Sequence, residues 1–250
     1  MNVGTGNNLM IGGFIINGSG PKAVVVRGLG PSLSGAGITN FLADPVLELR
    51  GSDGALIRKN DNWKDDQRSL IEGTIFQPTN DNESVIVATL NPGAYTALLT
   101  GKNQTTGIGL VEVYDNDTTA GSQLGNISTR GFVQTGNNVL IGGFILGNTG
   151  GNSRVALRGR GPSLAQFGLS PVLVDPTLEI HNSNGTILIS NDDWESDPVS
   201  AAELVANGLA PSDPKESGIF ATLPPGQFTA ILAGKNNGVG IGEVEIYNLK

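Results

Sequence analysis

Short runs of apolar residues alternate with polar, glycine-rich segments along the whole chain. In the first half the runs span residues 9–16, 23–29, 46–50, 55–60, 84–90, 94–100 and 107–114. Runs of this length, bounded by Gly, Pro, Asn and Asp, are typical of β-strands. SDG at 52–54 and SNG at 183–185 separate two apolar runs and predict hairpins. This spacing of short strands predicts an all-β fold built from β-sandwich, jelly-roll-like domains.

The sequence contains an internal repeat, because motifs of the first half recur in the second half. Four segments return with a few substitutions: TGNNLMIGGFI at 5–15 as TGNNVLIGGFI at 135–145, VRGLGPSL at 26–33 as LRGRGPSL at 157–164, DPVLEL…NDNW at 44–63 as DPTLEI…NDDW at 175–194, and ESVIVATL…TGKN at 83–103 as ESGIFATL…AGKN at 216–236. Such self-similarity indicates a tandem duplication. We therefore predict two β-sandwich repeats, at 1–116 and 125–250, joined by a polar linker at 117–124.

One short helix interrupts the strands in each half. In DPVSAAELVANGL, Asp197 is suited to cap the helix, Pro198 to its first turn and Gly208 to its end. The first half has a shorter version, DQRSLIEG, in which Asp66 and Gly73 take the same roles.

The charge and composition of the chain exclude some kinds of binding partner and chemical site. Lys plus Arg is 15 and Asp plus Glu is 23, which gives a net charge of −8. An acidic chain argues against nucleic acid as the main partner, because nucleic acid attracts clustered Lys and Arg. No apolar run approaches the ~18 residues of a membrane-spanning helix. With no Cys, disulfides, thiolate metal sites and Cys nucleophiles are excluded.

The sequence offers no conventional catalytic centre, and we predict that the chain is not an enzyme. His181 is the only histidine, and Arg50 takes its place in the first half. A single unduplicated His is expected at the surface rather than in a Ser-His-Asp triad. RGLGPSL and RGRGPSL do not match a phosphate-binding loop, so their glycines are expected to mark a bulge or a tight corner.

Charged residues recur at the ends of apolar strands. Arg27 and Arg158 are repeated, as are Asp44, Asp175, Glu48 and Glu179. These positions suit ion pairs at the rim of a sandwich, or the paired carboxylates of a glycosidase. We favour the ion pairs, because duplication would require two active sites.

Both tryptophans lie in matching acidic heptads, NDNWKDD at 60–66 and NDDWESD at 191–197. Hard oxygen ligands gathered in one loop suit Ca²⁺, with candidate ligands Asp61, Asp66, Glu83, Asp192, Asp197 and Glu216. The alternative is structural: Asp61 and Asp192 hold the turn, Asp66 and Asp197 cap helices, and Trp63 and Trp194 anchor one end of the sandwich. Calcium is therefore a candidate cofactor, and no other cofactor is expected.

The string NISTR…GGFI…RGxGPSL…DPxLEL…NDxW resembles a domain found in tandem in secreted proteins of environmental bacteria, and covers nearly the whole chain. A looser resemblance links the DPxLEL, DG and ND elements to bacterial pre-peptidase C-terminal domains, which are calcium-associated β-sandwiches. Both resemblances imply an extracellular or cell-surface location. The N-terminus MNVGTGNN lacks the character of a signal peptide. We accordingly expect either no signal peptide or a mature or trimmed chain.

The two halves differ at their starts. LGNISTRGF at 124–132 precedes the second half and can form a strand, whereas the first half begins at MNV. If that segment pairs with a sheet, the first half exposes an edge that invites strand addition from another chain. We expect a non-catalytic structural or adhesive module that self-associates, or joins neighbouring repeats, through exposed sheet edges. The alternative is a calcium-assisted carbohydrate-binding module that binds polysaccharide.

Overall fold

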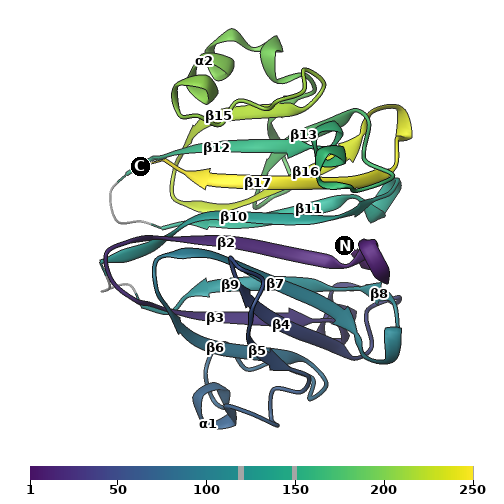
Figure 1. The fold of residues 1–250 in the computed structure, drawn as a ribbon, viewed down its shortest axis with the longest axis vertical. Helices are drawn as coiled ribbons and strands as arrows, with labels where there is room; N and C mark the ends of the chain where they lie inside the picture. Colours follow the sequence, from purple (N-terminus) through teal and green to yellow (C-terminus); the bar gives the residue numbers. More distant parts are fainter. Residues whose placement is uncertain (118–120, 148–150, 250) are drawn as a thin grey trace. The chain divides into compact units, whose positions relative to one another are not determined.

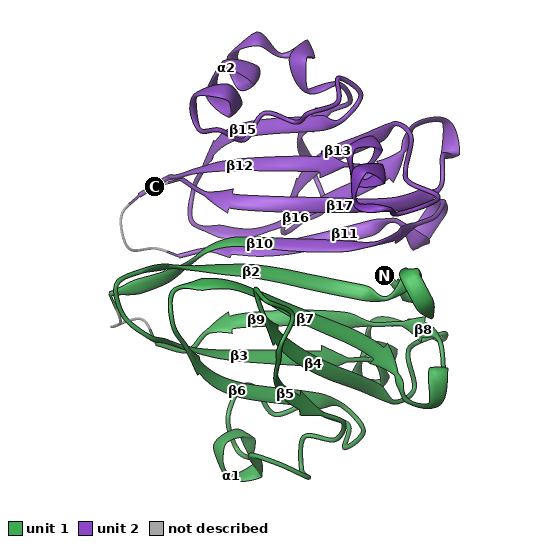
Figure 2. Ribbon diagram, in the orientation of Figure 1, with its two compact units in different colours: residues 1–127 green, residues 128–250 purple. Residues whose placement is uncertain are grey.

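Antiparallel strands form most of the regular structure in the computed structural model, which describes residues 1–117, 121–147 and 151–249 (Figure 1). Two compact units span Met1–Ile127 and Ser128–Lys250 (Figure 2). In each unit the strands form two sheets, and the helices are few and short. The prediction of an all-β, sandwich-like fold is confirmed.

Unit 1 contains two sheets and a short ladder. Its strands are β1 (Asn2–Val3), β2 (Met10–Gly18), β3 (Lys22–Leu29), β4 (Pro45–Gly51), β5 (Leu56–Asn60), β6 (Ser84–Leu90), β7 (Gly93–Gly101), β8 (Gly107–Ile108), β9 (Leu110–Asp115) and the part of β10 (Ser122–Val133) up to Ile127; its helix is α1 (Arg68–Ile71). One sheet has the order β10-β2-β7-β4-β5 and the other β6-β3-β9, while β1 pairs with β8.

The core of unit 1 follows from alternation along the strands. In β2, every second residue is buried, namely Met10, Gly12, Phe14 and Ile16. Phe14 of β2 and Leu47 of β4 belong to the same core cluster as Val26 of β3. Because side chains of a strand point alternately to its two faces, each sheet presents an apolar inner face. Each large side chain buried there contributes about 1.5–3 kcal/mol.

Unit 2 repeats the arrangement. Its strands are the remainder of β10, β11 (Leu140–Leu146), β12 (Ser153–Arg160), β13 (Pro176–Asn182), β14 (Ile187–Asn191), β15 (Ser217–Leu223), β16 (Gly226–Gly234) and β17 (Gly240–Asn248); its helix is α2 (Pro198–Ala206). The sheet orders are β11-β16-β13-β14 and β15-β12-β17-β10. Short 3-10 turns lie at Gly6–Asn8, Pro31–Ala36, Lys102–Gln104, Gly136–Asn138, Pro162–Phe167, Trp194–Ser196 and Lys235–Asn237.

The RGxGPSL loops make tight corners, as expected. A Cβ on Gly30 would lie 1.9 Å from the carbonyl oxygen of Leu42, and one on Gly161 would lie 2.1 Å from that of Leu173. Only glycine allows backbone to approach this closely. Each corner leads directly into a 3-10 turn that begins at Pro31 or Pro162.

The helix of unit 2 is capped as predicted, and that of unit 1 is not. The Oδ1 atom of Asp197 accepts a hydrogen bond from Val199 N at 3.0 Å, and α2 begins at Pro198. In unit 1, Gln67 is the N-cap residue of α1 and makes no capping hydrogen bond through its side chain. Asp66 instead pairs with Arg58. The predicted capping role of Asp66 is therefore wrong.

The predicted linker at 117–124 overlaps β10, which begins at Ser122. The Oγ atom of Ser122 accepts a hydrogen bond from Gly20 N at 3.1 Å, so this end of the segment is tied to unit 1. Residues 118–120 lie outside the described part of the chain. Within the described residues, no helix is long and apolar enough to cross a membrane.

Candidate functional sites at the acidic corners and the sheet edges

The acidic heptad of unit 1 forms the corner that follows β5. Asn60 accepts a hydrogen bond from Val85 N at 2.9 Å through Oδ1 and donates to the carbonyl of Asn62 at 3.0 Å. Trp63 N donates to the carbonyl of Glu83 at 2.8 Å. Asn191 and Trp194 make the corresponding bonds in unit 2. The repeated Asn and Trp thus join the corner to the neighbouring strand through backbone groups.

A lysine closes each acidic corner. Lys102 Nζ lies 2.6 Å from Asp61 Oδ2 and 3.6 Å from Asp44 Oδ2. In unit 2, Lys235 Nζ lies 2.5 Å from Asp192 Oδ2. The pKa of each lysine is raised, first because the ammonium donates a hydrogen bond to its aspartate. The repeated GKN tripeptide marks these lysines in the sequence, but their pairing with the heptads was not predicted.

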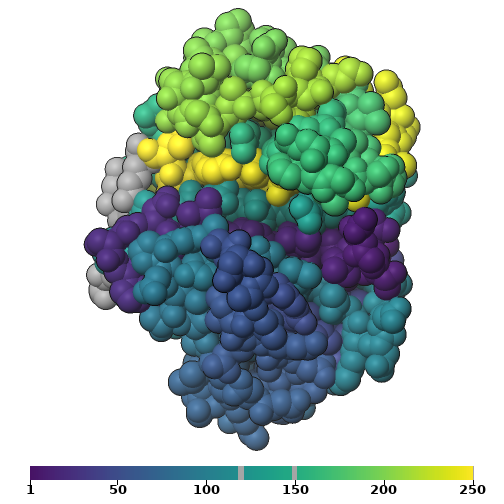
Figure 3. Space-filling view, in the orientation of Figure 1, coloured from purple at the N-terminus to yellow at the C-terminus, as the bar shows by residue number. Residues whose placement is uncertain are grey.

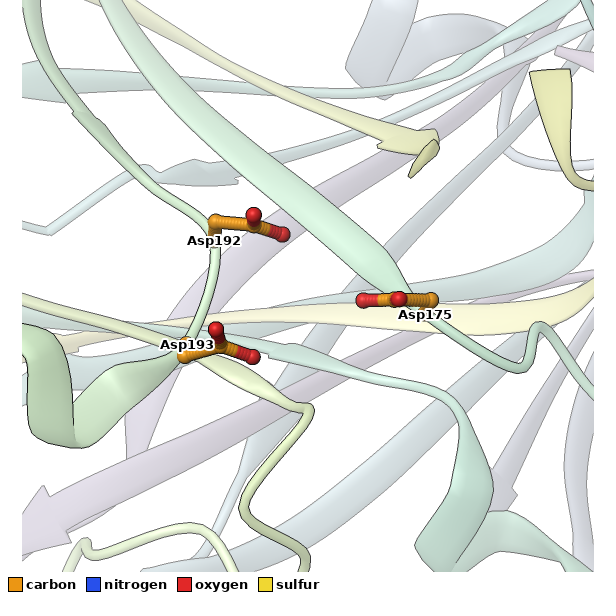
Figure 4. Close-up of side chains that lie close together, drawn as sticks. All are labelled: Asp175, Asp192 and Asp193. Carbon is orange, nitrogen blue, oxygen red and sulfur yellow. The ribbon is translucent and has the colours of Figure 1, made fainter. Parts of the chain in front are cut away.

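Unit 2 gathers three carboxylates, those of Asp175, Asp192 and Asp193, whose candidate ligand atoms all lie within 4.8 Å of one another (Figure 4). One oxygen each of Asp175 and Asp192 is inaccessible to solvent and makes no hydrogen bond; the same is true of Asp44 and Asp61 in unit 1. An all-oxygen set suits Ca²⁺. Asn62 takes the place of Asp193 in unit 1, so only unit 2 offers three carboxylates.

The remaining predicted ligands lie in other environments. Glu83 and Glu216 are fully buried, and each accepts hydrogen bonds from two backbone N–H groups of an RGxGPSL loop: Gly30 and Ser32 in unit 1, at 3.0 and 2.8 Å, and Gly161 and Ser163 in unit 2, at 2.9 and 3.0 Å. Asp66 pairs with Arg58, and Asp197 caps α2. Of the six predicted ligands, only Asp61 and Asp192 lie in the lysine-closed corners. Asp175 and Asp193 were not among the predicted ligands.

Calcium binding stays a prediction, and thermal melting tests it. If Lys235 moves aside and the three carboxylates hold Ca²⁺, the free energy of unfolding rises by about 2.7 kcal/mol at 100 times Kd. The melting temperature is then higher in calcium than in EDTA. Asp193→Asn, which copies Asn62 of unit 1, is expected to abolish the difference. Identical melting curves in calcium and in EDTA would contradict calcium binding at this corner.

The recurring arginines form ion pairs, but with partners other than those predicted. Arg27 Nε donates to Glu112 Oε2 at 2.7 Å, and Arg158 Nε donates to Glu245 Oε2 at 2.7 Å. Both pairs lie between neighbouring strands, β3 with β9 and β12 with β17. Arg50 and Lys59 pair with Glu48 instead.

The only histidine is partly buried at the border of a surface depression, so the expectation of a surface residue is not contradicted. His181 is 14% exposed, and its ring lies 2.7 Å from Glu179 Oε2 and 3.0 Å from the carbonyl oxygen of Gly185. It borders a shallow, open depression together with Gln227, Thr229 and Ile231. The two partners are a carboxylate and a backbone carbonyl, and neither is a serine hydroxyl, so this arrangement is not a Ser-His-Asp triad.

The outer edge of β9 has no neighbouring strand within the described residues. β9 pairs with β3 on one side, and the β1·β8 ladder stops at Gly109, whose carbonyl accepts a hydrogen bond from the Met1 ammonium at 3.0 Å. The counterpart of β9 in unit 2 is β17, which has β12 on one side and β10 on the other. Val111 and Val113 are half-buried, whereas their counterparts Val244 and Ile246 are 0% and 5% exposed.

A second sheet edge shows the same contrast. β11 is the last strand of its sheet, whereas its counterpart β2 has β10 beside it. Ile141 and Ile145 of β11 are 45% and 68% exposed, while the corresponding Ile11 and Ile15 of β2 are half-buried. Within the described residues, β9 and β11 are thus edge strands, whereas their counterparts β17 and β2 each have a strand on both sides.

The edge strands β5 and β14 also carry exposed apolar side chains. Leu56 and Ile57 of β5 are 51% and 45% exposed, and Ile187 and Leu188 of β14 are 52% and 43% exposed. The segment around β5 and α1, coloured blue, lies at the surface of unit 1 in the space-filling view (Figure 3). β5 also carries Arg58 and Lys59, charges of the kind that discourage edge pairing, whereas β14 carries none.

Comparison with known proteins gives no family. No protein-family model matches the chain, and no curated protein matches it. The chain is remotely similar to the crystal structure of a “putative secreted protein” from Eubacterium rectale, with 9% identity, a TM-score of 0.22, and coverage of 94% of this chain and 68% of that one. It is also similar to the VP2 subviral particle of infectious bursal disease virus, with 9% identity, a TM-score of 0.20, and coverage of 99% and 69%. Neither likeness carries an argument about function.

Proposed function

We propose that the chain is a non-catalytic structural module of an extracellular assembly, whose subunits join by adding strands to open sheet edges. The observation that carries the proposal is the edge of β9, which has no strand beside it among the described residues, whereas β10 lies beside its counterpart β17. A strand edge with unpaired N–H and C=O groups is a template for pairing with another chain. The extracellular location rests on the resemblance of the repeated motifs to secreted domains.

The recurring charged residues support a structural role. Three charged residues of unit 1 each have a partner within that unit. Arg27 pairs with Glu112 of β9, Lys102 pairs with Asp61 of the acidic corner, and Glu83 accepts hydrogen bonds from the backbone of the RGxGPSL loop. The same bonds recur in unit 2. Side chains committed to such bonds hold the fold, and are poorly placed to act as free acids or bases.

Carbohydrate binding is the weaker candidate. A sugar-binding face uses exposed aromatic rings, but Trp63 is only 1% exposed and packs with Val25, Ile71 and Val85. Trp63 therefore has no open face for stacking.

Sedimentation velocity over a concentration series tests the assembly. The Val113 N–H lies on the same side of β9 as Gly109 N–H, which pairs with Met1, because backbone groups alternate along a strand. Val113→Pro therefore removes an outward donor while leaving the β3 ladder intact. We expect wild-type chain to form oligomers as concentration rises, and Val113→Pro to weaken this association about tenfold or more.

Val113→Ala is the matched control, because it loses side-chain packing but keeps the N–H group. It is expected to associate like wild type, and both variants are first checked for folding by circular dichroism. Monodisperse monomer at high concentration, or equal association of the Pro and Ala variants, would count against strand addition at β9.

A further inference from the structure

The edge strand β11 of unit 2 lacks the features that usually keep a strand edge from pairing with another chain. In the described part of the chain, β11 pairs with β16 alone. Its sequence LIGGFIL contains no charged residue and no proline, although the whole chain has a net charge of −8. Charged residues and proline are common means of protecting an edge strand. The open side of β11 is therefore unprotected.

The hydrogen bonds of this sheet show which backbone groups of β11 face the open side. Lys235 N, directly after β16, donates to the carbonyl of Asp175 at 2.8 Å, so odd-numbered residues of β16 direct their N–H and C=O groups to β13. Even-numbered residues of β16 consequently bond to β11, where their partners are also even-numbered. The N–H and C=O groups of Ile141, Gly143 and Ile145 therefore point to the open side.

These three residues match themselves when the strand is turned about a two-fold axis through Gly143. Two β11 strands paired antiparallel in this register place Gly143 opposite Gly143 of the second copy, and Ile141 opposite Ile145. Each of the three residues then exchanges both its N–H and its C=O with its partner. The side chains of Ile141 and Ile145, 45% and 68% exposed, become cross-strand neighbours of the β-branched kind that stabilises sheets.

The neighbouring strand adds no charge beside this edge. β16 places Gln227, Thr229 and Ile231 opposite the three outward residues of β11. Neither strand contains a charged residue. Two copies of an acidic chain can therefore pair at β11 without a carboxylate of β11 or β16 facing its own image.

We infer that β11 is a dimerisation strand, on which a second copy of this chain pairs antiparallel with Gly143 opposite Gly143. The inference rests on the proposed function, because it uses pairing at an open sheet edge, and deepens it by specifying the partner and the register at a second edge. A two-fold interface uses the same surface of both copies and closes with a dimer. Strand addition at β9 can then join such dimers into a longer assembly.

Charge substitutions in the full chain test the inference by sedimentation velocity. Ile145→Glu places a carboxylate opposite Ile141 of the second copy and is expected to raise the dissociation constant of the dimer about tenfold or more. Adding Ile141→Lys to the same chain places an ammonium opposite each new carboxylate and is expected to restore most of the association. The two positions of one chain lie about 13 Å apart along the strand, so only pairing between copies explains a rescue.

Ile187→Glu is the matched control, because Ile187 is also exposed but lies on β14, at the other edge of the same sheet. This variant is expected to dimerise like wild type. Equal association of wild type and Ile145→Glu, or no rescue by Ile141→Lys, would overturn the inference.

Val113→Pro separates this inference from the proposed strand addition at β9. A dimer that persists in Val113→Pro and is lost in Ile145→Glu supports pairing at β11, even if β9 takes no strand. Association that is lost in Val113→Pro and persists in Ile145→Glu supports the proposed function and overturns the dimer at β11.

Discussion

Glu83→Ala is expected to lower the free energy of unfolding of unit 1 by about 3 kcal/mol or more. The carboxylate is fully buried and accepts hydrogen bonds from Gly30 N and Ser32 N, and from the Ser32 hydroxyl. Alanine leaves two backbone N–H groups without an acceptor inside the protein, each costing about 1–3 kcal/mol. The measurement is urea denaturation followed by intrinsic fluorescence.

The duplicated chain supplies a matched comparison for this carboxylate. In unit 2, Arg160 donates to the Ser163 hydroxyl, and Oε2 of Glu216 has no hydrogen-bond partner. Glu216→Gln therefore gives up less than Glu83→Gln, which disturbs the bond to Ser32. We expect Glu83→Gln to cost about 1–2 kcal/mol more than Glu216→Gln. If the two Gln variants lost equal stability, the hydrogen bond from Ser32 to Oε2 of Glu83 would contribute nothing.

Trp63→Ala is expected to cost about 3–5 kcal/mol, because it opens a large cavity. The side chain is 1% exposed and lies among Val25 of β3, Val85 of β6 and Ile71 of α1. It therefore fixes α1 to the outer face of the three-stranded sheet. Urea denaturation gives the loss, and hydrogen exchange at α1 shows whether the helix detaches first.

Two further variants test whether the Trp63 ring acts as a packing anchor. The Nε1 atom of Trp63 is buried and has no hydrogen-bond partner, so Trp63→Phe removes an unsatisfied donor and is expected to cost much less than Trp63→Ala. Trp194 is only half-buried, so Trp194→Ala should cost less than Trp63→Ala. If Trp63→Ala left stability unchanged, the role of this ring as an anchor would be refuted.

Apolar runs bounded by turn residues made most strands predictable from sequence. The expected run at 84–90 coincides with β6, and those at 9–16 and 94–100 fall within one or two residues of β2 and β7. The helix in unit 2 was predictable because Asp197 and Pro198 are local signals whose effect needs no partner from elsewhere. The tight corners at Gly30 and Gly161 were readable from glycines kept in both copies.

Side-chain pairings between residues that lie far apart in the sequence could not be predicted from the sequence. Asp66 looks like Asp197, but Arg58 pairs with it, whereas unit 2 has Ile189 at the position of Arg58. The partner of Arg27 is Glu112 because β3 and β9 pair in one register, which no local pattern specifies. Likewise, the GKN lysines reach the acidic corners only once β4, β5 and β7 are assembled. The acidic cluster of unit 2 was missed for the same reason, because Asp175 comes from a different segment than Asp192.

Amide hydrogen exchange at β9 tests the central claim most directly. The N–H groups of Val111 and Val113 point to the open side, whereas that of Glu112 points to β3 and serves as an internal control. In dilute chain we predict fast exchange at both valines and slow exchange at Glu112. In the assembled form, both valines should gain protection of more than about 100-fold, equivalent to about 2.7 kcal/mol. Valine amides as protected as Glu112 in dilute chain, or still unprotected after assembly, would contradict strand addition at β9.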